Sequence, residues 1–181
     1  MRRSTIPVHV ALIWLAAAPL AARAQQMPNP YGPDVGLDAA RHAADAALAE
    51  AKKNGWTVAA SVVDTHGDLI FFERLENTQY GSIHVSQEKA RSAAQFKRPT
   101  KAFEDAVNGG HPNVLGLPGA VPLEGGVPLV SAEGKVVGAI GVSGATSAQD
   151  AQCAWAGAAA IGMGAHAAAA SPAAPGAPAK K

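Results

Sequence analysis

The stretch GKVVGAIGVSGATSAQDAQCA, residues 134–154, decides the fold of this chain. Its first half, Lys135–Ser143, is apolar or small at almost every position and predicts a long strand. Its second half opens a helix, because Ser147 and Asp150 have the spacing of a capping box with Asp in the place of Glu. Apolar residues then recur on one side of that helix through Ile161. The stretch therefore predicts a strand followed closely by an amphipathic helix.

Two segments upstream predict a β-hairpin. WTVAASVV (Trp56–Val63) and LIFFER (Leu69–Arg74) are rich in β-branched and aromatic residues, and the turn Asp64–Asp68 joins them. Because VAASVV is apolar almost throughout, we expect both faces of the sheet to be covered. Gly126–Ser131 pairs in the same way with Lys135–Ser143, through a turn at Glu133 and Gly134.

The segments before and between these strands have the periodicity of helices. Residues 37–54 repeat Ala and Leu on one side, with Gly55 as a stop, and residues 82–96 form a second helix. A short helix from Pro99 through Val107 precedes a Gly- and Pro-rich loop, residues 111–125. The order α-β-β-α-α-β-β-α predicts an α+β fold: an antiparallel sheet flanked by helices.

The two ends of the chain are expected to lie outside this domain. Arg2 and Arg3, an apolar run broken by His9 and Pro19, and the sequence Ala-Arg-Ala at residues 22–24 are typical of a secretory signal peptide. The run is too short and interrupted for a stable membrane span. We therefore expect cleavage after Ala24 and a periplasmic or secreted protein, exported by the general or the twin-arginine route. Residues 25–36 then form a leader, residues 37–164 the domain, and residues 165–181 a disordered Ala/Pro-rich tail.

Composition excludes several classes of protein. The net charge is +1, and removing residues 1–24 lowers Lys and Arg from 15 to 12 against 14 acidic residues, which gives −2. Such a chain has no basic surface for nucleic acid. Its single cysteine, Cys153, allows no internal disulfide and is expected to pack as a small apolar residue.

Four motifs in order resemble the GlcG/HbpS-like family, also called domain of unknown function 336. They are VVDTHGDLIFFER (62–74), EKARSAAQFKRPT (88–100), GGVPLV (125–130) and the stretch 134–154. The similarity runs from about Leu37 to Gly162. It implies a profilin-like fold and a homo-oligomer, often an octamer. It also implies either non-covalent haem binding or a role beside the oxidation of glycolate, diols or alcohols. The family's usual Arg-Met-Asp-Gly is Arg-Leu-Glu-Asn here, at residues 74–77.

The haem interpretation requires an axial ligand and cations for the propionates. The axial-ligand candidates are His84, His42 and Thr100, the last because the resemblance covers its Pro-Thr pair. Candidates for binding propionates or another anion are Lys89, Arg91, Arg98 and the backbone at Gly144, which precedes a helix N-terminus. Lys89 can equally bury its stem and leave its ammonium in water. His84 is preferred, because Ile83 and Val85 flank it.

Other functional readings stay open. His66 lies in the hairpin turn and is expected to be solvated, and the acidic residues around that turn either bind a cation or are solvated strand ends. His84 and Glu88 have i,i+4 spacing, but two ligands are too few for a structural metal site. No acid/base pair or nucleophile motif stands out, which favours a binding protein over an enzyme. The rival interpretations are an enzyme or accessory protein for small hydroxy acids or alcohols, and a structural oligomer with a vestigial pocket.

Overall fold

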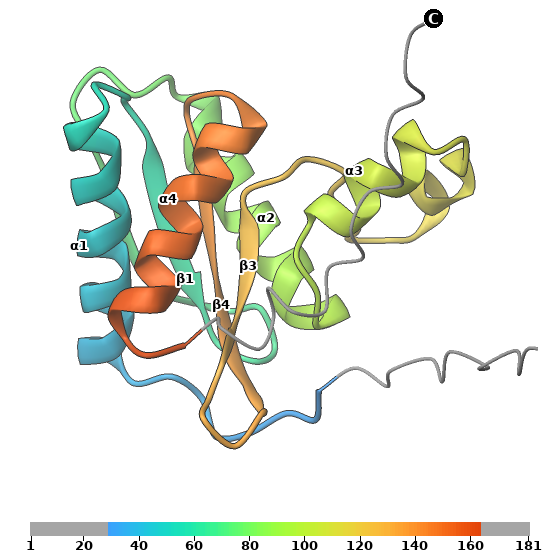
Figure 1. Ribbon diagram of the computed structural model, residues 1–181, viewed down its shortest axis with the longest axis horizontal. Coiled ribbons are helices and arrows are strands. Elements are labelled where there is room, and N and C mark those ends of the chain that lie inside the picture. The colour runs from blue at the N-terminus through green and yellow to red at the C-terminus, as the bar shows by residue number, and fades with distance from the viewer. Residues whose placement is uncertain (1–28, 164–181) are drawn as a thin grey trace, which may run out of the picture.

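The computed structural model describes residues 29–163, and the α+β prediction is confirmed (Figure 1). The expected signal peptide and the whole of the expected Ala/Pro-rich tail lie outside the described residues. The elements are α1 (Leu37–Lys53), β1 (Ala59–Val63), β2 (Leu69–Arg74), α2 (Gly81–Phe96), α3 (Lys101–Asn108), the 3-10 helix η1 (Pro112–Gly116), β3 (Gly126–Val130), β4 (Val136–Ser143) and α4 (Ser147–Ala160).

The four strands form one antiparallel sheet in the order β2-β1-β4-β3. The hairpins β1–β2 and β3–β4 are those that the sequence predicts, and they join through β1 and β4 at the centre. Every residue of β1 and β4 is buried, whereas β2 is partly exposed at the edge. A two-sided sheet accounts for this burial, since each residue of a central strand then meets a helix on one face or the other.

Helices cover both faces of the sheet, as predicted. The main apolar core joins α1 and α4 to one face, and a smaller cluster with Ala90 and Ala94 joins α2 to the other. Small residues bring these layers close together. A Cβ on Gly141 would collide with the α2 backbone at Ser86, and one on Gly157 would collide with the α1 backbone at Ala43. The segment α3–η1 extends away from these layers (Figure 1).

The segment before α1, expected as a leader, is partly built into the domain. Tyr31 forms a parallel bridge with Val136, and the Val35 N–H donates to the carbonyl of Val137 at 2.7 Å. The Val35 side chain is buried in the main core. The domain therefore begins before Leu37.

Two local details differ from the expectations. The N-cap of α4 is Thr146, whose hydroxyl accepts the N–H of Gln149 while the Gln149 side chain accepts the N–H of Thr146. The capping box thus lies one residue before the predicted pair, Ser147 and Asp150, and Asp150 has another role. The Gly- and Pro-rich loop also contains the 3-10 helix η1. The sequence does not predict η1, because Gly and Pro are typical of turns. None of the helices between residues 29 and 163 has the length and apolar character of a bilayer-spanning segment.

Candidate functional site

An open hollow of about 510 Å³ lies where the N-terminal segment, the β1–β2 turn and the end of α2 meet. The residues that line it are Tyr31, Gly32, Thr65, His66 and Gln95. Its volume is in the range of about 300–1,000 Å³ that accommodates cofactor-sized ligands. Hydrogen bonds fix its walls: Tyr31 Oη donates to the carbonyls of Ala94 and Gln95 at 3.0 Å, and Gln95 Nε2 donates to the His66 carbonyl at 2.9 Å.

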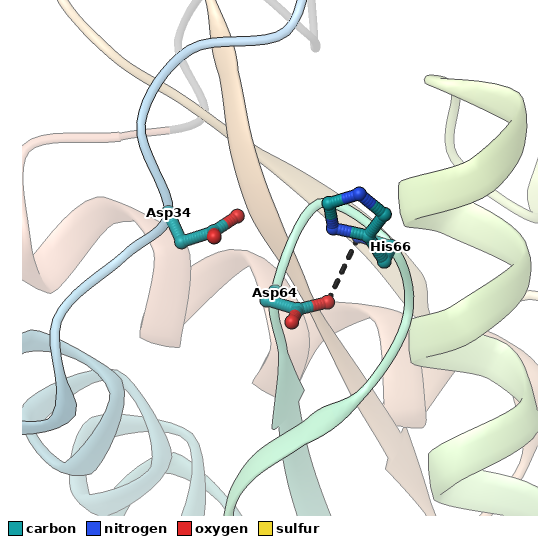
Figure 2. Close-up of side chains that lie close together, drawn as sticks. All are labelled: Asp34, Asp64 and His66. Atoms are coloured by element: carbon teal, nitrogen blue, oxygen red, sulfur yellow. Dashed lines mark hydrogen bonds between the residues drawn. The ribbon is translucent and has the colours of Figure 1, made fainter.

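Two carboxylates stand beside the imidazole of His66. One ligand atom from each of Asp34, Asp64 and His66 lies within 4.8 Å of the other two. Figure 2 shows the Asp34 carboxylate pointing toward the turn that carries Asp64 and His66. One imidazole and two carboxylates form a donor set suited to a divalent transition metal, and the same imidazole could ligate haem iron.

Backbone and hydroxyl groups hold both carboxylates in place. Asp64 Oδ1 accepts the N–H groups of residues 66, 67 and 68 at 2.8–2.9 Å, which closes the turn. Asp34 Oδ1 accepts the Thr65 N–H at 3.0 Å and the Thr65 hydroxyl at 2.6 Å. These two bonds lower the pKa of Asp34, because they stabilise its ionised form.

Cationic side chains lie near the same hollow. The Lys97 ammonium lies 4.7 Å from the centroid of the Tyr31 ring. Arg91, a predicted propionate candidate, donates from Nε to the Gly67 carbonyl at 3.2 Å and pairs with Glu88 at 2.6 Å. Its side chain remains 38% exposed, so the guanidinium is accessible to an anion beside the turn.

The preferred histidines of the sequence analysis lie apart from each other. His84 is exposed on the outer side of α2, on the polar stripe that also carries Glu88 and Arg91. His42 is exposed on α1, which packs on the opposite face of the sheet. The two cannot serve one ligand within a single protomer.

Arg98 lies on the loop that follows α2. Its Nε donates to the Phe96 carbonyl at 3.2 Å, and its guanidinium lies 5.9 Å from the centroid of the Phe103 ring. It is exposed, but these contacts hold it against the beginning of α3 rather than beside His84.

Lys89 turns inward, which the sequence analysis did not expect. Its ammonium donates to Asp150 Oδ2 at 2.8 Å and to the Val142 carbonyl at 3.1 Å, and both side chains of the pair are at most 3% exposed. Burial raises the pKa of Asp150, while Lys89 and the N–H of Ala145 act in the opposite direction. Lys89 is thus a structural link between α2 and α4, and its ammonium is not free for a propionate.

The Asp150 carboxylate also binds the backbone next to Gly144. Asp150 Oδ1 accepts the Ala145 N–H at 3.0 Å, so the chain supplies its own anion at the beginning of α4. Gly144 is glycine for a steric reason: its φ is +149°, and a Cβ there would lie 2.6 Å from Val58 Cα. The anion seat predicted at this position is therefore filled from within.

Thr100 is also directed into the protein. Its side chain is fully buried, and its hydroxyl accepts the N–H of Gly126 at 2.9 Å. The Thr100 N–H donates to the Gly126 carbonyl at 3.0 Å, so this residue attaches the beginning of α3 to β3. A hydroxyl held in this way does not face a ligand on the surface.

Cys153 packs as predicted. It is fully buried in the core, and burial raises the pKa of its thiol to about 12. An unreactive thiol of this kind is structural rather than nucleophilic.

Comparison with known proteins places this geometry in a family. The model described as "Haem degrading protein HbpS-like" matches residues 35–159. The chain belongs to the HbpS-like family. The match begins at Val35, the buried residue before α1, in agreement with the domain boundary seen in the structure.

Individual relatives agree with the family match. Protein GlcG of Escherichia coli K12 is 45% identical over 93 residues, which cover 51% of this chain and 69% of that protein. The crystal structure of a double mutant of Streptomyces reticuli HbpS has a TM-score of 0.65 at 36% identity and covers 80% of this chain and 97% of that one. The crystal structure of a PduOC–haem complex has a TM-score of 0.65 at 26% identity and covers 72% and 97%.

Within this HbpS-like domain, sequence reasoning missed His66 and Asp34 as site residues. The turn position of His66 predicts solvation, and Asp34 lies in the segment taken as a leader. Only the fold brings them together, because the N-terminal segment pairs with the beginning of the central strand β4, beside the β1–β2 turn. Two features of the sequence could have pointed to these residues. One is the cluster of Asp and His residues in that turn, and the other is an Asp within the Pro- and Gly-rich segment that precedes α1.

Proposed function

We propose that this protein binds haem, or a related tetrapyrrole, non-covalently after export from the cytoplasm. The observation that carries the proposal is the PduOC–haem complex, whose protein shares this fold over 97% of its chain at 26% identity. Membership of the HbpS-like family supports it. The chain has no Cys-x-x-Cys-His motif, so covalent attachment of a c-type haem is excluded.

The hollow beside His66 is the place that fits this ligand best. It combines an exposed imidazole with the ring of Tyr31 as an aromatic wall, and the cations of Lys97 and Arg91 contact residues next to it. Neutral imidazole is the usual protein ligand of haem iron, and the cations suit the propionates. The Thr65 hydroxyl lies 3.4 Å from His66 Nδ1, and a hydrogen bond there orients the imidazole and leaves Nε2 as the ligand atom. Bound haem would supply redox and gas-binding chemistry at the iron.

His84 is the competing axial ligand, and its apolar neighbours in the sequence favour it. Ile83 and Val85 beside it are half-buried, and Arg91 lies two turns further along the same stripe, about 10 Å along the helix axis. This arrangement presents a ligand and a cation on an open helix face. His66 differs from His84 because His66 borders a hollow large enough for a cofactor-sized ligand.

A haem titration of the mature protein tests the function. We expect a saturable change in the Soret band, with a stoichiometry of one haem per protomer. A free-haem spectrum at every protein concentration would overturn the proposal. In that case the alternative, an accessory protein or enzyme for small hydroxy acids or alcohols, becomes the leading interpretation.

A further inference from the structure

A second cavity, of about 160 Å³, lies on another side of the domain. It forms where the beginning of α3, the beginning of β3 and the second turn of α4 meet. Its walls include the apolar side chains of Pro99, Val127, Ala151 and Trp155, and two charged side chains, Lys101 and Glu124, also line it. The liquid volume of one water is about 30 Å³, so the space suits about five small heavy atoms and is far too small for a tetrapyrrole.

Gly125 and Gly126 form the floor of this cavity. A Cβ on Gly125 would lie 2.9 Å from Lys89 Nζ and 2.9 Å from Asp150 Cβ, so the backbone rests directly on the buried ion pair. The floor is therefore closely packed against that pair, and it carries no side chain that could fill the space.

Glu124 places a carboxylate at the edge of the cavity, and this carboxylate forms no ion pair with another described residue. It is half-buried, and within residues 29–163 no cationic group lies within 4.0 Å of its carboxylate. The nearest cations hold other acids: Lys101 bonds to Asp105 at 2.7 Å, and Lys89 bonds to Asp150.

The charges around Glu124 leave a negative excess. The backbone N–H of Glu124 donates to the Glu104 carboxylate at 2.6 Å, and Asp105 follows Glu104 on α3. Burial raises the pKa of Glu124, Glu104 and Asp105 raise it further, and Lys101 and Lys89 lower it. A positive ligand would relieve this excess, whereas a carboxylate ligand would add to it.

Trp155 completes the recognition surface for a cation with an apolar body. Indole is the best aromatic partner for an ammonium group and also covers a short aliphatic chain. We propose that this cavity binds a small organic cation, a primary ammonium with a short aliphatic tail, whose charge pairs with Glu124 and whose tail lies against Trp155 and Val127.

Three probes with the same carbon chain test the charge preference: n-butylammonium, 1-butanol and butyrate. The mature protein is titrated with each, and the amide signals of Gly125 and Gly126 and the Trp155 indole signal are followed by NMR. We expect saturable shifts at these signals with n-butylammonium, at least about tenfold tighter than with 1-butanol or butyrate. Equal or tighter binding of butyrate, or no saturable shift with n-butylammonium, would overturn the proposal.

Glu124→Gln keeps the shape of the side chain and removes its charge. We expect this variant to bind n-butylammonium no more tightly than 1-butanol. Glu133→Gln is the matched control, because Glu133 is an exposed carboxylate on the β3–β4 turn away from the cavity, and it should retain the tenfold preference. If Glu124→Gln keeps the preference as well, the assignment of Glu124 is wrong. A haem titration of Glu124→Gln should match the original protein, because the two sites are separate.

Discussion

At the residue scale, the histidines of the described domain differ in what lies beside them. His66 borders a hollow of about 510 Å³ and stands within 4.8 Å of two carboxylates. His84 lies on an exposed polar helix stripe, and His42 lies on the far side of the sheet. An imidazole binds iron well only when its surroundings orient it and shield the ligand from water. The surroundings therefore favour His66 over His84, and His84 over His42.

The first prediction concerns these imidazoles. We expect His66→Ala to weaken haem binding by about tenfold or more, which corresponds to about 1.4 kcal/mol, and to shift the Soret band. His84→Ala should have a smaller effect, and His42→Ala should bind haem like the original protein. Equilibrium titrations followed at the Soret band measure all three.

Thr100→Ala is the control for an oxygen ligand in that series. Its hydroxyl is buried against Gly126, so the variant should lose stability rather than haem affinity. If His84→Ala has the largest effect, the ligand sits on the outer face of α2 and the hollow is not the haem site. If all four variants titrate alike, no residue of the set is the axial ligand.

At the scale of elements, the buried pair of Lys89 and Asp150 joins helices from opposite faces of the sheet. α2 supplies the ammonium and α4 the carboxylate, and the contact passes the end of β4 at Val142. A buried charge that loses its partner is strongly unfavourable, because it keeps its desolvation penalty. This pair therefore fixes how the two helices sit at one end of the sheet.

The second prediction is that Lys89→Met lowers the free energy of unfolding by about 3–5 kcal/mol, since it leaves Asp150 buried without its partner. Lys101→Met is the matched control. It breaks an ion pair with Asp105 whose side chains are 41% and 45% exposed, and should cost about 0–1 kcal/mol. Urea unfolding followed by circular dichroism measures both. Equal losses in the two variants would show that the buried pair contributes no more than a surface pair.

The third prediction concerns the beginning of α4. Thr146→Ala removes the hydroxyl that accepts the Gln149 N–H and should cost about 0.5–2 kcal/mol. Ser147→Ala should cost less than about 0.5 kcal/mol, because Ser147 lies inside the helix and does not cap it. Thermal unfolding of the two variants compares them directly, and a larger loss for Ser147→Ala would place the cap at the residue that the sequence pattern indicates.

At the scale of the whole molecule, the core is built largely from alanine. Ala side chains fill the α1–α4 and α2–sheet contacts, and each buries little apolar area. Several large apolar side chains remain exposed on the α3–η1 side and at the beginning of α2: Tyr80, Leu115, Leu117 and Leu123. A domain of this kind gains stability when copies share surface.

The fourth prediction is therefore a closed homo-oligomer larger than a dimer, and the family resemblance suggests an octamer. Light scattering coupled to size-exclusion chromatography measures the mass of the mature protein. A monomer at micromolar concentration would contradict this prediction.

The fifth prediction concerns processing, which acts on the chain as a whole. Export should remove residues 1–24 and yield a mature protein that begins at Gln25, because Ala-Arg-Ala follows an apolar run. Intact mass and N-terminal sequencing of periplasmic material test this. A full-length chain that stays in the cytoplasm would show that these residues are not a cleaved signal.

Local patterns in the sequence were sufficient for the helices and strands, the two hairpins and the fold class. Continuous apolar runs determine buried strands, a 3.6-residue repeat determines amphipathic helices, and turn residues determine the hairpins, so β1–β2, β3–β4 and the helix bounds could be predicted to within a few residues. These patterns depend only on neighbours along the chain. They also predicted that both sheet faces are covered and that Cys153 is buried.

Tertiary structure alone decided which polar groups meet. Lys89 and Asp150 are 61 residues apart, and Asp34 and Thr65 are 31 apart. No local periodicity encodes such a pairing, so the sequence pattern indicates a surface cation at Lys89 and a helix cap at Asp150. The hollow beside His66 arises in the same way, from an N-terminal segment that pairs with the beginning of β4. The apolar pattern determines which elements form. The direction of a single charged side chain depends on partners that only the assembled fold brings within hydrogen-bond distance.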